Sequence, residues 1–191
     1  MKTFTDFDEI LKPGKPVVLT IGVFDGVHLG HQQLLKTAKA LAKKKETLLC
    51  VISFSTHPRE TLQRDIIIHH ITTLDDRMHL LQQYEVDILV IVPFTKELAK
   101  LTSEEFCSFV NRHLPFSDLV LGYDATIGSD QKENRKHVEE AAEKIGFTVY
   151  YVPPVSIKGI PVSSSRIRKL LKDEKFQDAE DMLGHERFRK L

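Results

Sequence analysis

Two patterns of apolar residues alternate along the chain. Short apolar runs rich in β-branched residues predict buried strands at 16–21, 47–54, 87–92, 118–121 and 148–152. Apolar residues spaced three or four positions apart predict helices at 32–44, 74–84, 103–110, 134–145, 164–171 and 175–183. A capping box from Thr102 to Glu105 starts the third of these helices, and Gly184 ends the last. Strands that alternate with helices in this way predict an α/β fold built on a doubly wound parallel sheet.

Length, charge and cysteine content narrow the class of protein. The 191 residues fit one domain, and 27 basic residues balance 27 acidic ones, so no global field attracts nucleic acid or an anionic membrane. The amino terminus lacks the apolar core of a signal peptide, and no apolar run reaches membrane-spanning length. Cys50 and Cys107 fall on predicted buried elements. We therefore expect a cytoplasmic protein without nucleic-acid or membrane partners; its oligomeric state is not indicated.

A glycine-rich turn with two histidines follows the first predicted strand. Its glycines allow the backbone to approach a ligand closely, and the helix that follows directs free N–H groups at the turn. A polyphosphate bound there would meet those groups, the positive end of the helix dipole and two imidazoles. The turn therefore predicts a phosphate site, with Asp25 orienting its backbone N–H groups. The candidate residues are Gly22, Phe24, Asp25, His28, Gly30 and His31.

Three other interpretations of this turn are weaker. A plain strand-to-helix turn needs neither two histidines nor three glycines. A zinc pair lacks a nearby cysteine and the glutamate found between the histidines of metalloprotease helices. A Walker-type loop lacks Lys-Ser or Lys-Thr after the last glycine.

A second cluster, at the start of the helix predicted at 164–171, contains hydroxyl and guanidinium groups. Ser163, Ser164 and Ser165 are favoured residues for a helix start, and the arginines at 166 and 168 could form a solvated face. The same groups at a helix N-terminus also form an anion cradle.

The two clusters carry a resemblance to a known family. His28-Leu29-Gly30-His31 resembles the His-x-Gly-His signature of the nucleotidylyltransferase superfamily, whose fold is Rossmann-like. The longer string from Gly22 to Gln32 resembles the FMN adenylyltransferase module of bacterial FAD synthetases. Residues 162–168 are similar to the superfamily's Ile-Ser-Ser-Thr-x-x-Arg motif, with valine and serine at two positions. The resemblance implies triphosphate contacts from Ser163, Ser164, Ser165 and Arg168.

The resemblance also implies an acceptor site. His57, Pro58 and Arg59 match the family's Phe-x-Pro-His-Pro region, although Thr56 stands where proline is usual, and we place them in a long loop near the flavin. Asp124 matches the family's Gly-x-Asp-Phe-x-Phe-Gly motif and is a candidate for orienting the acceptor or helping to hold magnesium; it could equally be a turn residue. Ala125 and Ile127 replace that motif's two aromatic residues, which predicts weak FMN binding.

The implied reaction transfers AMP from ATP to FMN, which gives FAD and pyrophosphate with Mg²⁺ as cofactor. Family members often carry a riboflavin kinase module, whereas we expect residues 1–191 to form a single nucleotidylyltransferase domain without one. His28, His31 and Arg168 are the catalytic candidates. The alternatives are a cytidylyltransferase acting on a polyol or headgroup phosphate, or a catalytically impaired flavin- or nucleotide-binding protein.

Overall fold

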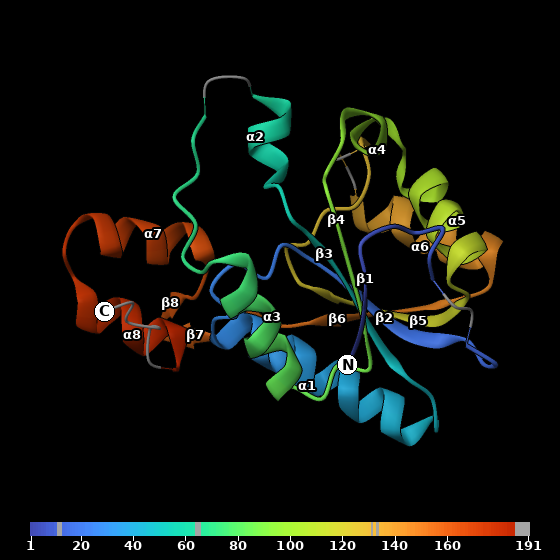
Figure 1. Cartoon of the computed structure of the whole chain (residues 1–191), viewed down its shortest axis with the longest axis horizontal. Coiled ribbons are helices and arrows are strands. Elements are labelled where there is room, and N and C mark those ends of the chain that lie inside the picture. The colour runs from blue at the N-terminus through green and yellow to red at the C-terminus, as the bar shows by residue number, and fades with distance from the viewer. Residues whose placement is uncertain (11–12, 64–65, 131, 133, 186–191) are drawn as a thin grey trace.

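A six-stranded parallel sheet forms the centre of the molecule (Figure 1). We analysed a computed structural model, which describes residues 1–10, 13–63, 66–130, 132 and 134–185. The strand order is β1-β4-β3-β2-β5-β6, and every neighbouring pair is parallel. The strands are β1 (Lys2–Phe4), β2 (Val17–Ile21), β3 (Leu49–Phe54), β4 (Ile88–Val92), β5 (Phe116–Gly122) and β6 (Thr148–Val152). This confirms the predicted doubly wound α/β fold.

Helices cover both faces of the sheet. Leu19 and Ile52 point to the face packed by α5 and α6, whereas Val18 and Val51 point to the face packed by α1 and α3. Side chains on successive strand residues point to opposite faces, so central strands covered on both sides are apolar at most positions. The helices of these two layers are α1 (Leu29–Lys44), α3 (Leu74–Gln83), α5 (Ser103–His113) and α6 (Asn134–Ile145).

The carboxy-terminal elements lie beyond the carboxyl ends of the strands. The two-stranded hairpin of β7 (Ser156–Ile157) and β8 (Ile160–Pro161) leads into α7 (Ser164–Lys172) and α8 (Phe176–Leu183), which lie together at the left of Figure 1. Ile167, Ala179 and Leu183 form a third apolar cluster with Ile71. This cluster attaches α7 and α8 to the end of the connection between β3 and β4.

Sequence periodicity located the long elements and missed the short ones. The predicted bounds of α6 and β6 are those observed, and Gly184 ends α8 with a left-handed φ of 69°. Helix α1 begins at Leu29 rather than at the predicted residue 32. The connection predicted as a long loop contains α2 (Pro58–Leu62), and α4 (Lys96–Lys100) precedes α5. Five-residue helices and an edge strand of three residues contain too few apolar positions to show a period.

The strand order changes direction between β2 and β5. From β2 the chain proceeds through β3 to β4 on one side, and then returns through α5 to β5 on the other. In open α/β sheets, ligands bind in the crevice outside the carboxyl ends of the strands at such a point. The crevice here is bordered by the glycine-rich turn after β2 and by the turn after β5.

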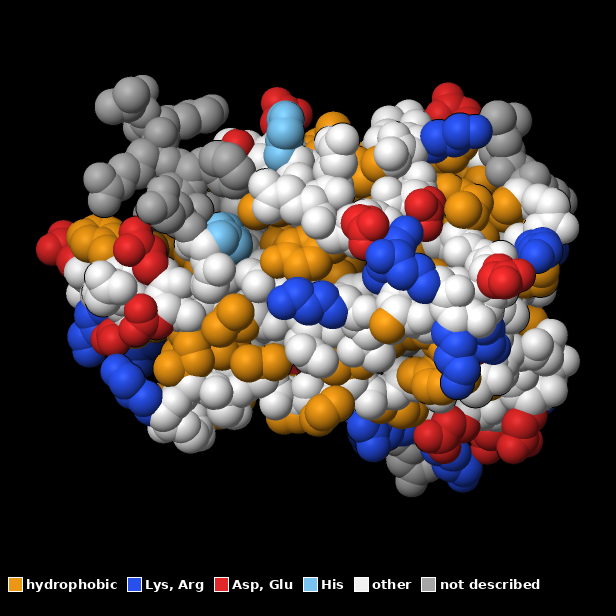
Figure 2. Space-filling model, turned by 90° about the horizontal axis from the view of Figure 1, so that it is seen from below, with side chains coloured by type: hydrophobic (Ala, Val, Ile, Leu, Met, Phe, Trp, Pro, Cys, Tyr) orange, Lys and Arg blue, Asp and Glu red, His pale blue; other side chains and the backbone are white. Residues whose placement is uncertain are grey.

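The protein surface has mixed charge. Figure 2 shows basic and acidic side chains interspersed on one face, as the equal numbers of the two kinds lead one to expect. Cys50 and Cys107 are both buried and unpaired, as predicted. Within the described residues, none of the helices combines the length and the apolar character needed to cross a membrane.

Candidate active site

The turn between β2 and α1 holds its residues in unusual backbone conformations. Phe24 has a φ of 53° and Val27 a φ of 37°, in the left-handed region that side chains rarely adopt. Gly26 has a φ of 80°, and a Cβ there would lie 3.0 Å from the Ile71 side chain. Strained conformations persist only where surrounding contacts impose them, and they concentrate at functional sites. The turn places His28 at the N-cap of α1, immediately before Leu29.

His28 and His31 are arranged as a stacked pair. The His28 Nδ1 atom accepts the backbone N–H of His31 at 3.4 Å and so caps α1. The two ring centroids lie 3.7 Å apart with an interplanar angle of 17°, and the Phe24 ring packs against His31. Since His28 Nδ1 accepts a hydrogen bond, its proton resides on Nε2, which is left as a donor for a ligand. The cap therefore selects the tautomer.

Both imidazoles are neutral at physiological pH. Burial lowers the pKa of His28 to about 4, although the nearby Asp25 carboxylate opposes this shift. Burial also lowers the pKa of His31 well below its usual value, and the positive charges of Arg77 and Arg168 lower it further. Each ring therefore offers one N–H donor rather than a fixed positive charge.

A cavity of about 220 Å³ opens beside the histidines. Gly30, Ser163, Ser164 and Asp124 line it together with both imidazoles, and Val152 to Val155 form an apolar wall. Helix α7 thus faces the start of α1 across the cavity, and the two predicted anion-binding clusters meet.

Asp25 connects the turn to α7 and to the end of the β3–β4 connection. Its buried carboxylate accepts the backbone N–H groups of Ile71 and Thr72 at 3.0 and 3.1 Å and pairs with Arg168 Nη2 at 2.8 Å. Its backbone carbonyl accepts the Ser164 hydroxyl at 3.0 Å. Burial raises the pKa of Asp25, but these N–H donors and the Arg168 charge outweigh it, so the net shift is downward. Asp25 orients N–H groups as expected, although they belong to residues 71 and 72 rather than to its own turn.

The other predicted nucleotide residues occupy different places. Phe24 is fully buried behind His31, and Gly22 lines a second cavity described below. Ser163 caps α7 by accepting the Arg166 N–H at 3.3 Å, whereas Ser165 is exposed and lies outside the cavity lining. The structure therefore brings His28, Gly30, His31, Ser163 and Ser164 to one cavity.

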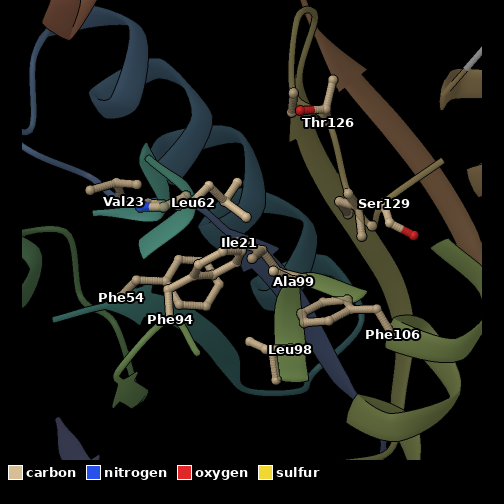
Figure 3. Close-up of a pocket in the computed structure, with 15 residues that line it drawn as sticks. Ile21, Val23, Phe54, Leu62, Phe94, Leu98, Ala99, Phe106, Thr126 and Ser129 are labelled. Carbon is tan, nitrogen blue, oxygen red and sulfur yellow. The ribbon is translucent and has the colours of Figure 1, made fainter. Parts of the chain in front are cut away.

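A second, apolar cavity of about 290 Å³ lies on the other side of the turn after β5. Phe54, Phe94 and Phe106 come from β3, from the segment after β4 and from α5, with Ile21 between them (Figure 3). The Phe54 and Phe94 rings meet edge to face with their centroids 5.1 Å apart, within the range that stabilises aromatic pairs. Three aromatic rings therefore border this cavity although positions 125 and 127 lack them.

The predicted acceptor residues separate around this cavity. Pro58 lines it, whereas His57 caps α2 by accepting the Arg59 N–H at 3.1 Å. The expectation of a plain loop at 57–59 is wrong, because these residues start a helix whose capping box uses Glu60. Asp124 lines the histidine cavity instead.

Positions 125 and 127 differ in the room they offer. Ala125 is half-buried at the wall of the apolar cavity, whereas the Ile127 side chain is 6% exposed and belongs to the main core. An aromatic ring can therefore be added at position 125, whereas a ring at position 127 would overpack the core.

Sequence reasoning missed two basic side chains near Asp25. His70 Nδ1 lies 3.9 Å from the Asp25 carboxylate and its Nε2 lies 3.6 Å from Glu60, although we had not expected it at a site. Arg77 is buried on α3, where it shares one helical stripe with Leu80 and Leu81. That spacing of three and four residues was the available indication, because a charge on an apolar stripe is out of place.

The described residues contain no group of three or more histidine, cysteine or acidic side chains that could hold a metal ion. Asp124 is the acidic residue among those that line the histidine cavity. A single carboxylate suits Mg²⁺, which usually keeps several waters and binds substrate phosphates.

Comparison with known proteins identifies one family. The family model described as FAD synthetase matches residues 11–166. The FAD synthetase of Listeria monocytogenes is 34% identical over 175 residues, which cover 91% of this chain and 71% of the relative. The bifunctional riboflavin kinase/FMN adenylyltransferases of Bacillus subtilis and Escherichia coli K12 are 33% and 30% identical. The matches span 54% and 56% of those two longer proteins.

A solved structure extends the likeness to the fold. The crystal structure described as a macrolide-efflux protein from Streptococcus pneumoniae superposes with a TM-score of 0.86 at 28% identity. The match covers 97% of this chain and 62% of that protein.

Proposed function

The chain belongs to the FAD synthetase family, and we propose that it transfers the AMP moiety of ATP to FMN, which forms FAD and releases pyrophosphate. The observation that carries this proposal is the pair of cavities on either side of the turn after β5. Residues 122–124 line the polar cavity with the histidines, and residues 125–129 line the apolar one. A nucleotide and a flat apolar ring system fit this arrangement, with their phosphates meeting at the turn.

On the polar side, the proposal assigns ATP to the histidine cavity. The triphosphate lies between the start of α1 and the start of α7, where helix N-termini favour anions. The Val152 to Val155 wall offers apolar contact to the base. Ser163 and Ser164 bind the β- and γ-phosphates from the cavity wall, and Arg168, which Asp25 orients, reaches them from outside the lining on the same helix; the exposed Ser165 has no contact in this arrangement.

An oxygen of the FMN phosphate attacks the α-phosphorus in line. A phosphorus–oxygen bond forms to FMN as the bond between the α-phosphorus and the pyrophosphate oxygen breaks, and the leaving group takes that electron pair. The attacking oxygen is already anionic, so no protein nucleophile is needed. His28 and His31 donate N–H bonds to phosphate oxygens on which negative charge grows, and such donors lower the barrier because they are positioned in advance.

On the apolar side, the isoalloxazine ring of FMN occupies the cavity bordered by Phe54, Phe94 and Phe106. Pro58 adds to this wall, and His57 and Arg59 lie beside it at the start of α2. Asp124 is placed between the two substrates, where it orients the acceptor phosphate.

Mg²⁺ is the proposed cofactor, and Asp124 is the protein carboxylate that would help to hold it. When bound, it would neutralise part of the charge on the substrate phosphates. The proposal also places the protein in the cytoplasm as one nucleotidylyltransferase domain, with ATP and FMN as its small-molecule partners.

Incubation with Mg²⁺ and each of ATP or CTP, with FMN present or absent, tests the proposal. We expect FAD and pyrophosphate in equal amounts from ATP and FMN, and neither product when FMN is omitted. Formation of a cytidine flavin dinucleotide from CTP at a similar rate would assign a different nucleotide specificity. Binding of FMN and ATP without any product would instead identify a binding protein.

A further inference from the structure

Arg77 is a charged side chain in the protein interior with no ion-pair partner among the described residues. Its side chain is 1% exposed, and it lies on the inner stripe of α3. Charged side chains are almost never fully buried unless they are paired, because removing a charge from water costs several kcal/mol. A buried arginine without a carboxylate therefore requires an explanation beyond packing.

The hydrogen bonds of Arg77 hold the carboxyl end of β3. Its Nη1 donates to the backbone carbonyl of Phe54 at 2.7 Å, while its Nε is buried without a hydrogen-bond partner. The neighbouring Ser53 hydroxyl donates to the carbonyl of Val23 in the glycine-rich turn at 3.0 Å. The strand end that Arg77 holds thus carries one ring of the apolar cavity (Figure 3) and contacts the turn before the histidines.

The buried charges near Arg77 do not balance. Asp25 and Arg168 are the two charged residues that act on its guanidinium, and they already form an ion pair at 2.8 Å. His28 and His31 add no charge in their neutral forms. One carboxylate therefore faces two guanidinium groups, which leaves one positive charge in excess in a buried region.

We infer that Arg77 is a positioning residue of the nucleotide site, whose uncompensated charge is neutralised by the phosphates of bound ATP and whose hydrogen bond fixes the strand end between the two cavities. It touches neither substrate, since it is absent from the lining of both cavities. Its charge acts through the low-dielectric interior, where an ion is screened less than at the surface.

This inference rests on the proposed function for the identity of the anion, but its test does not require FAD formation. Mg²⁺-pyrophosphate, the leaving group of the proposed reaction, is the probe, and its affinity is measured by calorimetry. The neutral variant is Arg77→Gln, whose amide can still donate to the Phe54 carbonyl. Arg77→Lys keeps the charge. Lys39→Met is the matched control, because it removes a partly buried cation from the Lys39–Asp87 pair at the opposite end of the sheet.

We expect Arg77→Gln to bind pyrophosphate about tenfold more weakly than wild type, because the charge that is removed acts on the phosphates through the low-dielectric interior without touching them. Arg77→Lys and Lys39→Met should stay within about twofold of wild type. Thermal unfolding separates this role from a structural one, because the rise in melting temperature caused by pyrophosphate should shrink in Arg77→Gln alone. Equal affinity and an equal rise in Arg77→Gln and wild type would overturn the inference.

Two further results keep the test decisive. Arg77→Met is a second neutral variant if Arg77→Gln does not fold. If neither neutral variant folds while Arg77→Lys does, the charge serves the fold itself and the positioning role is wrong. If wild type makes no FAD but Arg77→Gln still loses pyrophosphate affinity, the proposed function fails and the inference stands.

A titration of His31 by NMR adds a readout that packing alone would not move. The groups that face His31 are His28 on its own helix, Phe24 in the turn, Arg77 from α3 and Arg168 from α7. Removing the Arg77 charge should raise the pKa of His31, whereas Arg77→Lys should leave that pKa unchanged. The same His31 pKa in Arg77→Gln and wild type would contradict the electrostatic part of the inference.

Discussion

The two cavities beside the turn after β5 differ in how their contacts respond to the reaction. In the proposed reaction, the histidine cavity presents the N–H donors of its two imidazoles to phosphates, whose charge moves as bonds form and break. The apolar cavity presents Phe54, Phe94 and Phe106 to a ring that is the same before and after transfer. Contacts that strengthen only in the transition state raise kcat, whereas uniform contacts lower KM. We therefore infer that the histidine cavity determines kcat and that the apolar cavity determines which acceptor binds.

The largest effect concerns pH, which should affect the histidine cavity more than the apolar cavity. The folded pKa of His28, about 4, lies below its unfolded value of 6.5, so between these values the unfolded chain binds a proton that the native protein does not. The free energy of unfolding therefore falls as pH falls through this window, by about 3 kcal/mol for this group.

Urea unfolding at pH 7 and pH 4.5 measures this loss. The fall in the free energy of unfolding should be about 3 kcal/mol smaller in His28→Gln, because glutamine does not titrate. A variant in the apolar cavity, Phe94→Leu, should keep the wild-type pH dependence. Parallel curves for His28→Gln and wild type would show that the cavity does not depress the imidazole pKa.

Removing either imidazole should slow transfer more than it weakens ATP binding. We expect His28→Ala or His31→Ala to lower kcat by about 10²-fold with a smaller change in the KM for ATP, because each donor meets charge that grows during the reaction. Steady-state kinetics measures both constants, and His79→Ala, an exposed histidine on α3, is the control. A raised KM with unchanged kcat would move the histidines to the role we assign to the apolar cavity.

Substitution of Arg168 should raise the KM for ATP and leave the binding of FMN unchanged. Lysine keeps its charge but loses the planar fork that can pair with Asp25 and phosphate together. We expect Arg168→Lys to raise the KM for ATP by about tenfold with FMN binding unchanged. Arg166→Lys is the control on the same helix, because Arg166 is exposed. Equal losses for ATP and FMN would remove Arg168 from the triphosphate site.

The smallest effect tests the apolar cavity. Ala125→Phe places a ring at the half-buried wall and should tighten FMN binding about threefold, since aromatic contacts are worth about 0.5–1.5 kcal/mol beyond burial. Ala125→Leu adds apolar volume without a ring and should give a smaller gain. Fluorescence titration with FMN measures both. Weaker binding in a folded Ala125→Phe would show that the three existing phenylalanines already fill the cavity with the flavin.

Placing aromatic residues at both 125 and 127 is a less informative experiment than the family motif suggests, because the change at 127 would also strain the core. Ile127 lies in the main core, and inserting a phenylalanine there costs about 1–3 kcal/mol in strain. The sequence places Ala125 and Ile127 two residues apart in one motif, but it does not show that both border the apolar cavity while Ile127 is also packed in the main core.

The histidine cavity was more predictable from sequence than the apolar one. Its main residues occur in two short contiguous stretches, whose glycines, serines and histidines have local reasons to be there. The apolar cavity is assembled from β2, β3, α2, α4, α5 and three loops, and a phenylalanine that lines it has the same pattern as one in the core. Arg77 and His70 were missed for the same reason, because only the sheet topology brings them to Asp25.

The boundaries of α1 show a related limit. The apolar periodicity begins at residue 32 because Gly30 and His31, in the first turn of the helix, line the histidine cavity rather than the core. The side chain of His28, an uncommon cap, marks the true start at Leu29. Sequence rules for helix starts assume that the first turn faces solvent or core.

The glycine-rich turn is held by residues near the end of the chain, and this determines when the site can form during protein synthesis. The partners of its backbone and of Asp25 include Ser164, Arg168 and His185, which lie 139 to 159 residues further along the chain. Gln32, at the start of α1, bonds in the same way to the carbonyl of Leu183. A growing chain therefore carries both histidines long before α7 and α8 emerge to enclose them. The nucleotide can stabilise the native protein only after the last helix has docked, so it cannot guide the earlier folding of the sheet.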